Sequence, residues 1–213
     1  MGTPRPAGRR AAISANLPIR IEMMASTERS RALSRDRIVD AARALFYDQG
    51  YGAPMDAVAN AAGVAKPTVY AHFASKEELI AAVLERVDDE WFDQLQEVLR
   101  ERTGDPLGQL AAPFELLVAG LPDPAYHGCL LVNTAAVFCD PHHPAPHALA
   151  AHHARMREMF ETAAREAGAT DPAALSRQLL LLYDGVKTLG LVDNSGDGAK
   201  DARAAVSALL AAL

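Results

Sequence analysis

The feature that most constrains the fold is a pair of short helical patterns that meet at one glycine. The first pattern covers 54–62, where Pro54 is tolerated in the first turn and apolar residues recur on one face. Gly63 supplies a tight turn, and a second short pattern follows over 66–73. A helix-turn-helix unit needs a small turn residue, an apolar inward face and exposed polar residues early in the second helix. The sequence therefore predicts such a unit between 54 and 73.

A longer helix is predicted on each side of this pair. The preceding one covers 34–49, with Ser34 as its N-cap and apolar residues at helical spacing. The following one starts at a capping box formed by Ser75 and Glu78 and runs to about Arg102. The unit is thus a three-helix domain that leads into a long helix.

The remaining sequence also favours helices. The chain contains 43 alanines and only 6% aromatic residues, and alanine has the highest intrinsic helix propensity. We expect an all-α protein with an N-terminal three-helix domain and a larger helical domain. Further helices are expected at about 106–120, 128–140, 148–167, 173–192 and 199–212. The predicted regions are a flexible, arginine-containing arm over 1–33, a helix-turn-helix domain over 34–80 and a helical domain over 81–213.

The charge of the chain is divided unevenly along its length. The formal net charge is −6, but residues 1–80 carry +3 and residues 81–213 carry −9. No apolar run is long enough for a membrane-spanning helix, and no secretory signal pattern is present. Cys129 and Cys139 are too few for a disulfide scaffold. These features predict a cytoplasmic protein without a membrane partner.

The second short helix carries the polar residues that suit DNA contact. Lys66 can donate to guanine or phosphate, and Thr68 can donate or accept. The Tyr70 hydroxyl and the His72 ring can reach the DNA backbone. Lys76 begins the next helix, where its charge and the free amide groups favour a phosphate.

The order of residue types over about 35–85 resembles the DNA-binding domain of the TetR (tetracycline repressor) family. The resemblance lies in 37–46, 58–73 and 75–79, whose spacing matches across three helices. It implies a homodimeric transcriptional regulator, usually a repressor that a small molecule releases from a double-stranded DNA operator. The DNA-binding residues that it implies are Lys66, Pro67, Thr68, Tyr70 and His72 on the recognition helix, with Lys76 at the following helix start.

Two positions depart from that pattern. Family members commonly place Thr or Ser at the cap of the second helix and Ser before the recognition helix, where this chain has Pro54 and Ala65. One or two hydroxyl contacts to phosphate are therefore in question, and arginines of the arm could supply others.

The larger domain is expected to hold the dimer interface and an effector pocket. The resemblance implies pairing of the helices near 173–192 and 199–212, with a stripe of Leu175, Leu179, Leu182, Val186 and Leu189; the alternative is that these side chains form the core of the monomer. A pocket should be mostly apolar with a few polar anchors. The candidate pocket residues are Phe114, Leu117, Tyr126, Asn133, Val137, Phe138, Met159, Phe160, Tyr183 and Lys187.

Other chemistry receives little support from the sequence. Six histidines lie within 127–153, but the prolines of 141–146 favour a solvated loop over a metal site. The segment 193–204 begins like a calcium loop but ends in Ala204 rather than Glu. We expect no catalytic residues, no metal and no cofactor. The rival function is a helical enzyme or a small-molecule binding protein that does not bind DNA.

Overall fold

The structure is a computed structural model, and it describes residues 17–121, 126–189, 197–211 and 213. The described residues form nine helices and no strand, in agreement with the expected all-α class. The first four are α1 (Leu17–Gln49), α2 (Met55–Ala62), α3 (Lys66–His72) and α4 (Lys76–Glu101). The others are α5 (Pro106–Gly120), α6 (Leu130–Val137), α7 (Pro144–Glu166), α8 (Pro172–Leu189) and α9 (Asp197–Leu210).

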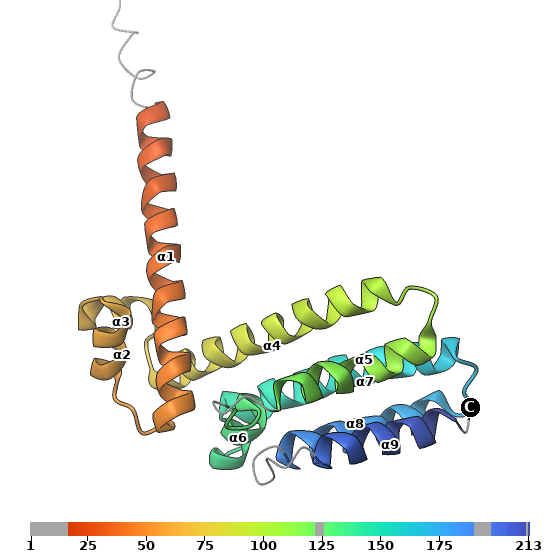
Figure 1. The fold of residues 1–213 in the computed structure, drawn as a ribbon. Helices are drawn as coiled ribbons and strands as arrows, with labels where there is room; N and C mark the ends of the chain where they lie inside the picture. The colour runs from red at the N-terminus through yellow and green to blue at the C-terminus, as the bar shows by residue number, and fades with distance from the viewer. Residues whose placement is uncertain (1–16, 122–125, 190–196, 212) are drawn as a thin grey trace, which may run out of the picture.

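Helix α1 begins much earlier than the sequence predicts. Its first residue is Leu17, so the expected N-cap at Ser34 was wrong, and 17–33 is helix where a flexible arm was expected. Ser34 instead lies within the helix and donates from Oγ to the Arg31 carbonyl at 2.9 Å. The extension lacks an apolar face, but no Pro or Gly interrupts the chain after Pro18 until the helix ends. Figure 1 shows it projecting away from the rest of the molecule.

The pair α2 and α3 has the predicted boundaries to within a residue. Gly63 adopts the left-handed conformation with φ of 64°, and its N–H bonds back to the end of α2. The N-cap positions Pro54 and Ala65 make no side-chain capping bond, as the sequence departures suggest. The inward faces of both helices pack on α1 in one apolar cluster.

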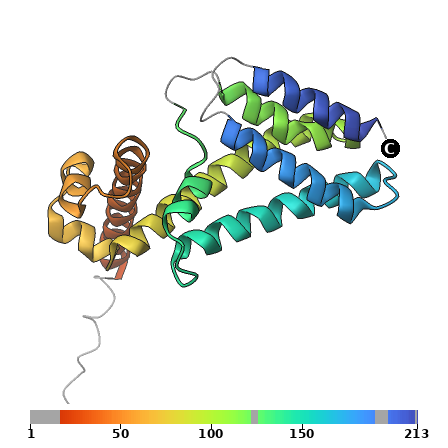
Figure 2. The same ribbon diagram turned by 90° about the horizontal axis from the view of Figure 1, so that it is seen from below.

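Helix α4 connects the two parts of the molecule. Ser75 caps it by accepting from the Glu78 N–H at 3.2 Å, and the Glu78 carboxylate accepts from the Ala74 N–H at 2.8 Å, which confirms the predicted helix start. Leu79 and its neighbours pack with α1 to α3, whereas Phe92 and Leu95 pack in a second cluster with α5 and α7 to α9. Figure 2 shows α4 running from the small domain into the larger helical body.

The larger body differs from the prediction in its helix starts. Helix α6 is shorter than expected and begins at Leu130. Helix α7 begins at Pro144, so the second half of the supposed loop 141–147 is helical; prolines are accepted in a first turn because its N–H groups have no helical partner. Helix α6 also ends at Val137, three residues before the predicted end, whereas the end of α7 at Glu166 is within one residue of the prediction.

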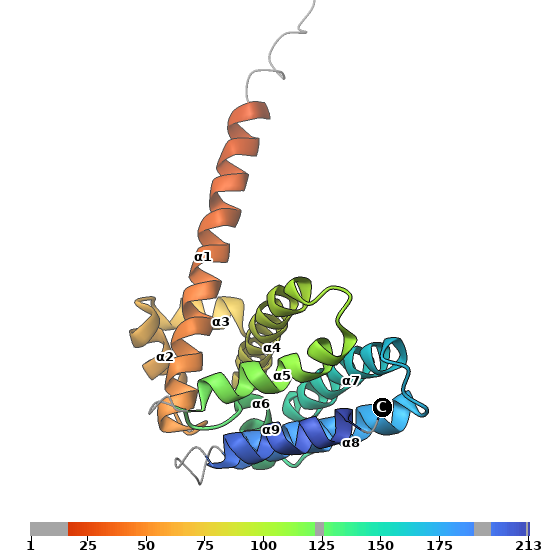
Figure 3. The same cartoon turned by 45° about the vertical axis from the view of Figure 1, so that its right-hand side comes forward.

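The leucine stripe of α8 is only partly available to a partner chain. Leu175, Leu179 and Val186 are buried within this chain, so the expectation that they form a dimer face was wrong. The side chain of Leu189 and residues 190–192 lie outside the described residues. Figure 3 shows α8 and α9 side by side along one side of the body. Among the described residues, no helix combines the length and apolar character needed to cross a membrane.

Candidate nucleic-acid interface and internal cavity

The outer side of α3 displays three of the residues that the sequence assigns to DNA contact. Lys66 and Pro67 are exposed, and the Tyr70 side chain keeps 45% of its surface accessible. Thr68 is half-buried at the same helix start. Lys66 forms an ion pair with Asp56 at 2.7 Å, and this hydrogen bond and charge raise the pKa of Lys66. Lys66 therefore lies outside the apolar core and forms an ion pair with a carboxylate of α2.

His72 faces α1 rather than open solvent. Its Nε2 lies 2.8 Å from the Ser34 hydroxyl, and the Arg31 guanidinium donates to the adjacent Ala71 carbonyl at 3.4 Å. Burial and then the charges of Arg31 and Arg35 lower the pKa of His72, so the ring is neutral at pH 7. The imidazole therefore fixes the end of α3 against α1.

Lys76 has an internal role that the sequence did not indicate. Its ammonium donates to the Ala53 carbonyl at 2.7 Å and to the Tyr51 carbonyl, and it lies over the Phe46 ring. These bonds join the start of α4 to the turn between α1 and α2. Contact with a DNA phosphate remains a prediction for this residue.

Replacement of Lys76 by methionine separates these two roles. Hydrogen bonds from a charged donor contribute about 1.5–3 kcal/mol each when their partners are shielded from water. We expect Lys76→Met to lower the free energy of unfolding by about 1–2 kcal/mol, measured by urea denaturation. Lys66→Met is the matched control, because its exposed ion pair adds little to stability. Unchanged stability of Lys76→Met would leave only a surface role for the lysine.

A cavity of about 610 Å³ lies where α1 meets the larger body. Residues of α1 form one wall, and residues of α4, α5, α7, α8 and the segment before α6 form the others. Most of the lining is apolar, with a few polar groups, as is usual for small-molecule sites. The lining residues are Asp40, Arg43, Ala44, Tyr47, Asp48, Val87, Trp91, Leu117, Tyr126, Gly128, Cys129, Leu130, Leu131, His152, Tyr183 and Lys187.

The structure brings together four of the ten candidate pocket residues. Leu117, Tyr126, Tyr183 and Lys187 line the cavity, and the Tyr126 hydroxyl donates to the Lys187 carbonyl at 3.3 Å. The other six lie elsewhere. Phe114 and Phe160 pack on each other in the core, Met159 lines a separate groove beside α4, and Asn133, Val137 and Phe138 line a depression near Tyr51.

Sequence reasoning missed most of the α1 and α4 wall. Tyr47, Val87 and Trp91 were not among the predicted pocket residues, because their contribution depends on how α1 and α4 pack on distant helices. The structure shows that the indole Nε1 of Trp91 is buried and has no hydrogen-bond partner among the described residues. A single tryptophan on a long amphipathic helix is a reasonable candidate for such a position.

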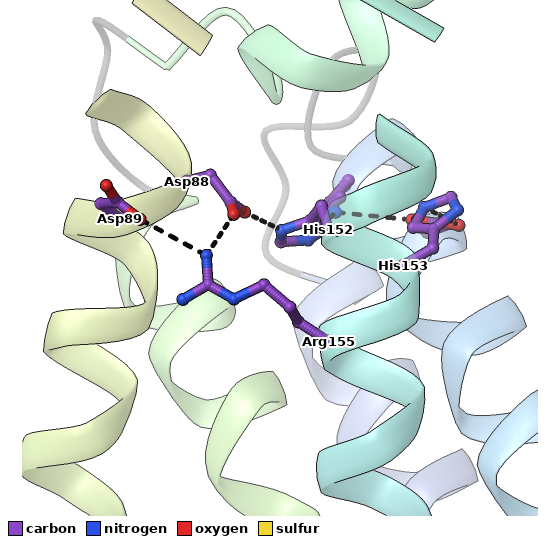
Figure 4. Close-up of polar contacts among 7 residues, drawn as sticks. Asp88, Asp89, His152, His153 and Arg155 are labelled. Atoms are coloured by element: carbon purple, nitrogen blue, oxygen red, sulfur yellow. Dashed lines mark hydrogen bonds and ion pairs between the residues drawn. The ribbon is translucent and has the colours of Figure 1, made fainter. Parts of the chain in front are cut away.

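A chain of polar contacts connects the cavity to α4. His152 donates from Nδ1 to the Asp88 carboxylate at 2.6 Å, and Lys187 donates to His152 Nε2 at 3.2 Å. Arg155 also donates to Asp88 and lies over the Phe92 ring at 3.6 Å. Figure 4 shows Asp88 on α4 between the His152 and Arg155 side chains of α7. The network holds α7 and α8 against the helix that enters the small domain.

Burial determines the protonation of this network. Desolvation lowers the pKa of His152 and outweighs the raising effect of Asp88. For Asp88, burial acts to raise the pKa, but the bonds and charges of His152 and Arg155 outweigh it and hold that pKa below its ordinary value. Asp184 pairs with His153 at 3.0 Å and with Lys187. Burial acts to raise the pKa of Asp184, but the bonds and charges of these two partners outweigh it and lower that pKa. The imidazole of His152 is therefore neutral at pH 7.

The lowered pKa of His152 predicts that acid weakens the fold. Below pH 6.5, the ordinary pKa of histidine, His152 binds a proton in the unfolded chain but stays neutral in the folded chain. The free energy of unfolding therefore falls as the pH falls through that value. Between about pH 7.5 and 5.5 we expect a loss on the order of 1 kcal/mol, measured by urea unfolding. His152→Gln should reduce this pH dependence, and His142→Gln at an exposed position should preserve it. Equal pH dependence in both variants would contradict the assignment.

Comparison with known proteins identifies the fold. The family model described as "Bacterial regulatory proteins, tetR family" matches residues 38–83. A solved TetR-family transcriptional regulator from Streptomyces coelicolor is 27% identical, with a TM-score of 0.77 over 84% of this chain and 95% of that one. The chain therefore contains a region similar to the TetR family model and has the fold of a TetR-family regulator. The relatives and the solved structure that match this chain are described as transcriptional regulators rather than as enzymes.

The curated relatives of this chain match it over a limited region. The transcriptional activator FasR of Mycolicibacterium smegmatis is 44% identical over 70 residues, which are 32% of each chain. The transcriptional repressor ComR of Escherichia coli is 42% identical over 65 residues, which are 30% of this chain and 31% of ComR. This chain thus spans about a third of the length of these two relatives.

Among the described residues, no group of three or more His, Cys, Asp or Glu side chains is placed to hold a metal ion.

Proposed function

We propose that this protein is a homodimeric DNA-binding transcriptional repressor that a small apolar or amphipathic ligand releases from its operator. The observation that carries the proposal is the position of the cavity. The cavity lies between α1 and the larger helical domain. Helix α1 also packs on the helix-turn-helix pair α2 and α3, and the larger domain is expected to bind the effector. The helix-turn-helix domain would comprise about 34–80, and 81–213 would form the ligand-binding and dimerisation domain.

The DNA-reading surface would be the outer side of α3. Lys66 and Tyr70 are exposed there, and a helix of this kind enters the major groove with its N-terminal residues toward the bases. Lys66 would contact a base edge, with Thr68 beside it, and Tyr70 would contact the backbone. Pro67, His72 and Lys76 would position the helix, since His72 and Lys76 are bonded to α1 and to the turn that follows it.

Release would follow from the contacts that surround the cavity. Tyr47 of α1 accepts from the His127 N–H at 2.6 Å through its hydroxyl, and Tyr51 bonds to Thr134 of α6. A ligand that fits the cavity best when α1 and α4 are displaced would favour that displaced state. In this state the α3 helices of the two subunits would no longer match the spacing of successive major grooves. Such a ligand shifts the equilibrium only by its difference in affinity for the two states.

The dimer would form through the uncovered faces of α8 and α9. Leu181 is 75% exposed, and Gly185 and Thr188 follow it on the same face of α8. On α9 the exposed residues Ala204 and Ala208 are small, which permits close approach of another helix. Pairing of these faces about a two-fold axis would bury Leu181 and place two reading helices on one duplex.

Repression is the simpler of the two regulatory outcomes. A bound dimer blocks transcription by occupying DNA alone, whereas activation also needs a productive contact with the transcription machinery. The relatives that match part of this chain include the activator FasR and the repressor ComR, so a reporter assay is required. Expression from a promoter that carries the selected operator should fall when the protein is present.

Selection of bound duplexes from a random pool tests the proposal. We expect a two-fold symmetric sequence with half-sites one helical turn or more apart, as two reading helices of a dimer require. Tyr70→Phe, which removes only the hydroxyl, should weaken binding without changing the selected sequence. Failure to enrich any sequence at low salt would favour the rival function of a small-molecule binding protein without DNA activity.

A further inference from the structure

Lys187 places a positive charge at the buried end of the cavity. Only 3% of its surface is exposed, and its ammonium lies 3.2 Å from His152 Nε2 and 3.4 Å from the Asp184 carboxylate. The Tyr183 ring lies beneath it at 4.1 Å. Buried charges are normally paired closely, because removing them from water is costly.

The charge of Lys187 is only partly compensated. His152 is neutral, and the Asp184 carboxylate is shared with His153, which it meets at a shorter distance of 3.0 Å. An ammonium group has three donors, and the contacts of Lys187 with His152 and Asp184 use two of them at the long end of the hydrogen-bond range. Among the described residues, the third donor has no acceptor, and Lys187 lines the cavity, so a negatively charged ligand group would suit this end of it.

The other charged residues of the cavity lie on its outer wall. Asp40, Arg43 and Asp48 belong to α1 and are exposed. Asp40 pairs with Arg86 at 3.3 Å, and Arg43 pairs with Glu90 of α4. These side chains keep their contact with solvent, so Lys187, whose charge Asp184 offsets in part, is the cationic lining residue at the buried end of the cavity.

Trp91 lines the same cavity and carries a donor that has no partner among the described residues. Its indole Nε1 is buried without a partner among the described residues, although buried N–H groups nearly always have one. The Trp91 ring also contacts the Tyr183 ring, with centroids 5.9 Å apart. Around these two donors the lining is aliphatic or aromatic, from Val87, Leu117 and Leu131 among others.

We propose that the ligand of this cavity is an amphipathic organic carboxylate, whose carboxylate binds the Lys187 ammonium and whose apolar body lies among the aliphatic and aromatic side chains. The inference rests on the proposed function only in taking this cavity as the effector site. A volume of about 610 Å³ suits an aryl or medium-chain aliphatic acid. The carboxylate would accept from the Lys187 ammonium, which a hydrocarbon or a protonated amine cannot do.

The fluorescence of Trp91 reports binding in this cavity directly, because it is the single tryptophan of the chain. The probes are 4-phenylbutyrate with its uncharged analogue 4-phenylbutanamide, and decanoate with decanamide. Each acid and its amide share one apolar body, so the difference in their affinities measures the carboxylate. We expect each acid to bind about tenfold or more tightly than its amide, since charge-assisted hydrogen bonds are about twice as strong as neutral ones.

Substitution of Lys187 locates that preference in one residue. Lys187→Met should abolish the difference between acid and amide while leaving amide binding in place, and Lys187→Arg should retain the difference. Lys200→Met, at an exposed position on α9, is the matched control and should behave as the unmodified protein. Circular dichroism and thermal unfolding of each variant establish that it is folded before its affinity is compared.

Three outcomes would overturn the inference. They are amides that bind as tightly as the acids, a preference for acids that persists in Lys187→Met, and an absence of any acid binding up to millimolar concentration. None of these measurements involves DNA, so they are independent of the selection experiment. A protein that binds its selected operator but shows no preference for acids would retain the proposed function and lose this ligand class.

Discussion

Replacement of Lys66 by alanine is expected to weaken binding to the selected operator by about a hundredfold or more. A well-placed lysine or arginine contact to guanine contributes roughly five- to a hundredfold in affinity, and a symmetric dimer loses the contact twice. The ion pair with Asp56 predicts a second result. Because Lys66 must leave this carboxylate in order to reach a base, Asp56→Asn should bind DNA more tightly than the unmodified protein.

The two substitutions together distinguish a base contact from a general effect of charge. Removal of Asp56 also removes a negative charge near the phosphates, so Asp56→Asn in the Lys66→Ala background measures that general effect alone. We expect most of the gain from Asp56→Asn to require Lys66. Affinities are measured by fluorescence anisotropy at two salt concentrations on the selected duplex and on a duplex altered at one position. A loss that is equal on both duplexes would place Lys66 at a phosphate instead.

The parts of the fold that the sequence predicted are those that local chemistry determines. Gly63 adopts the left-handed conformation that its position between two short helices requires, and Ser75 and Glu78 cap α4 as their spacing indicates. The start of α1 was not predictable in this way. Helix over 17–33 has no apolar face, so hydrophobic periodicity gives no signal there, and Ser34 resembles a cap although it lies inside the helix.

The distribution of apolar residues in α8 does not show which face of the helix packs on the core. Leucines occur at four consecutive positions from Leu179 to Leu182, so several faces of the helix are apolar and the pattern leaves open which one meets the core. The structure buries Leu179 and exposes Leu181. The wall of the cavity that α1 and α4 form was equally beyond local reasoning, because Tyr47 and Trp91 meet the predicted pocket residue Lys187 only when α1, α4 and α8 pack.

Exposure of Leu181 leads to the second large expected effect. A leucine that becomes fully buried contributes about 1.5–3 kcal/mol, and a two-fold interface buries it in both chains. Aspartate at this position would lose that contribution and would bring two carboxylates to the interface without partners. We expect Leu181→Asp to raise the dimer dissociation constant by about a thousandfold or more, measured by sedimentation velocity over a range of concentrations.

Val137 provides a matched control for this experiment. It is also a large exposed apolar residue, with 62% of its surface accessible, but it lies at the end of α6 rather than on α8 or α9. Val137→Asp should therefore remain a dimer. Because a monomer can engage only one half-site, Leu181→Asp should also lose the preference for two correctly spaced half-sites over one, while its α3 surface stays intact. A Leu181→Asp protein that remains dimeric and folded would show that the chains pair through another face.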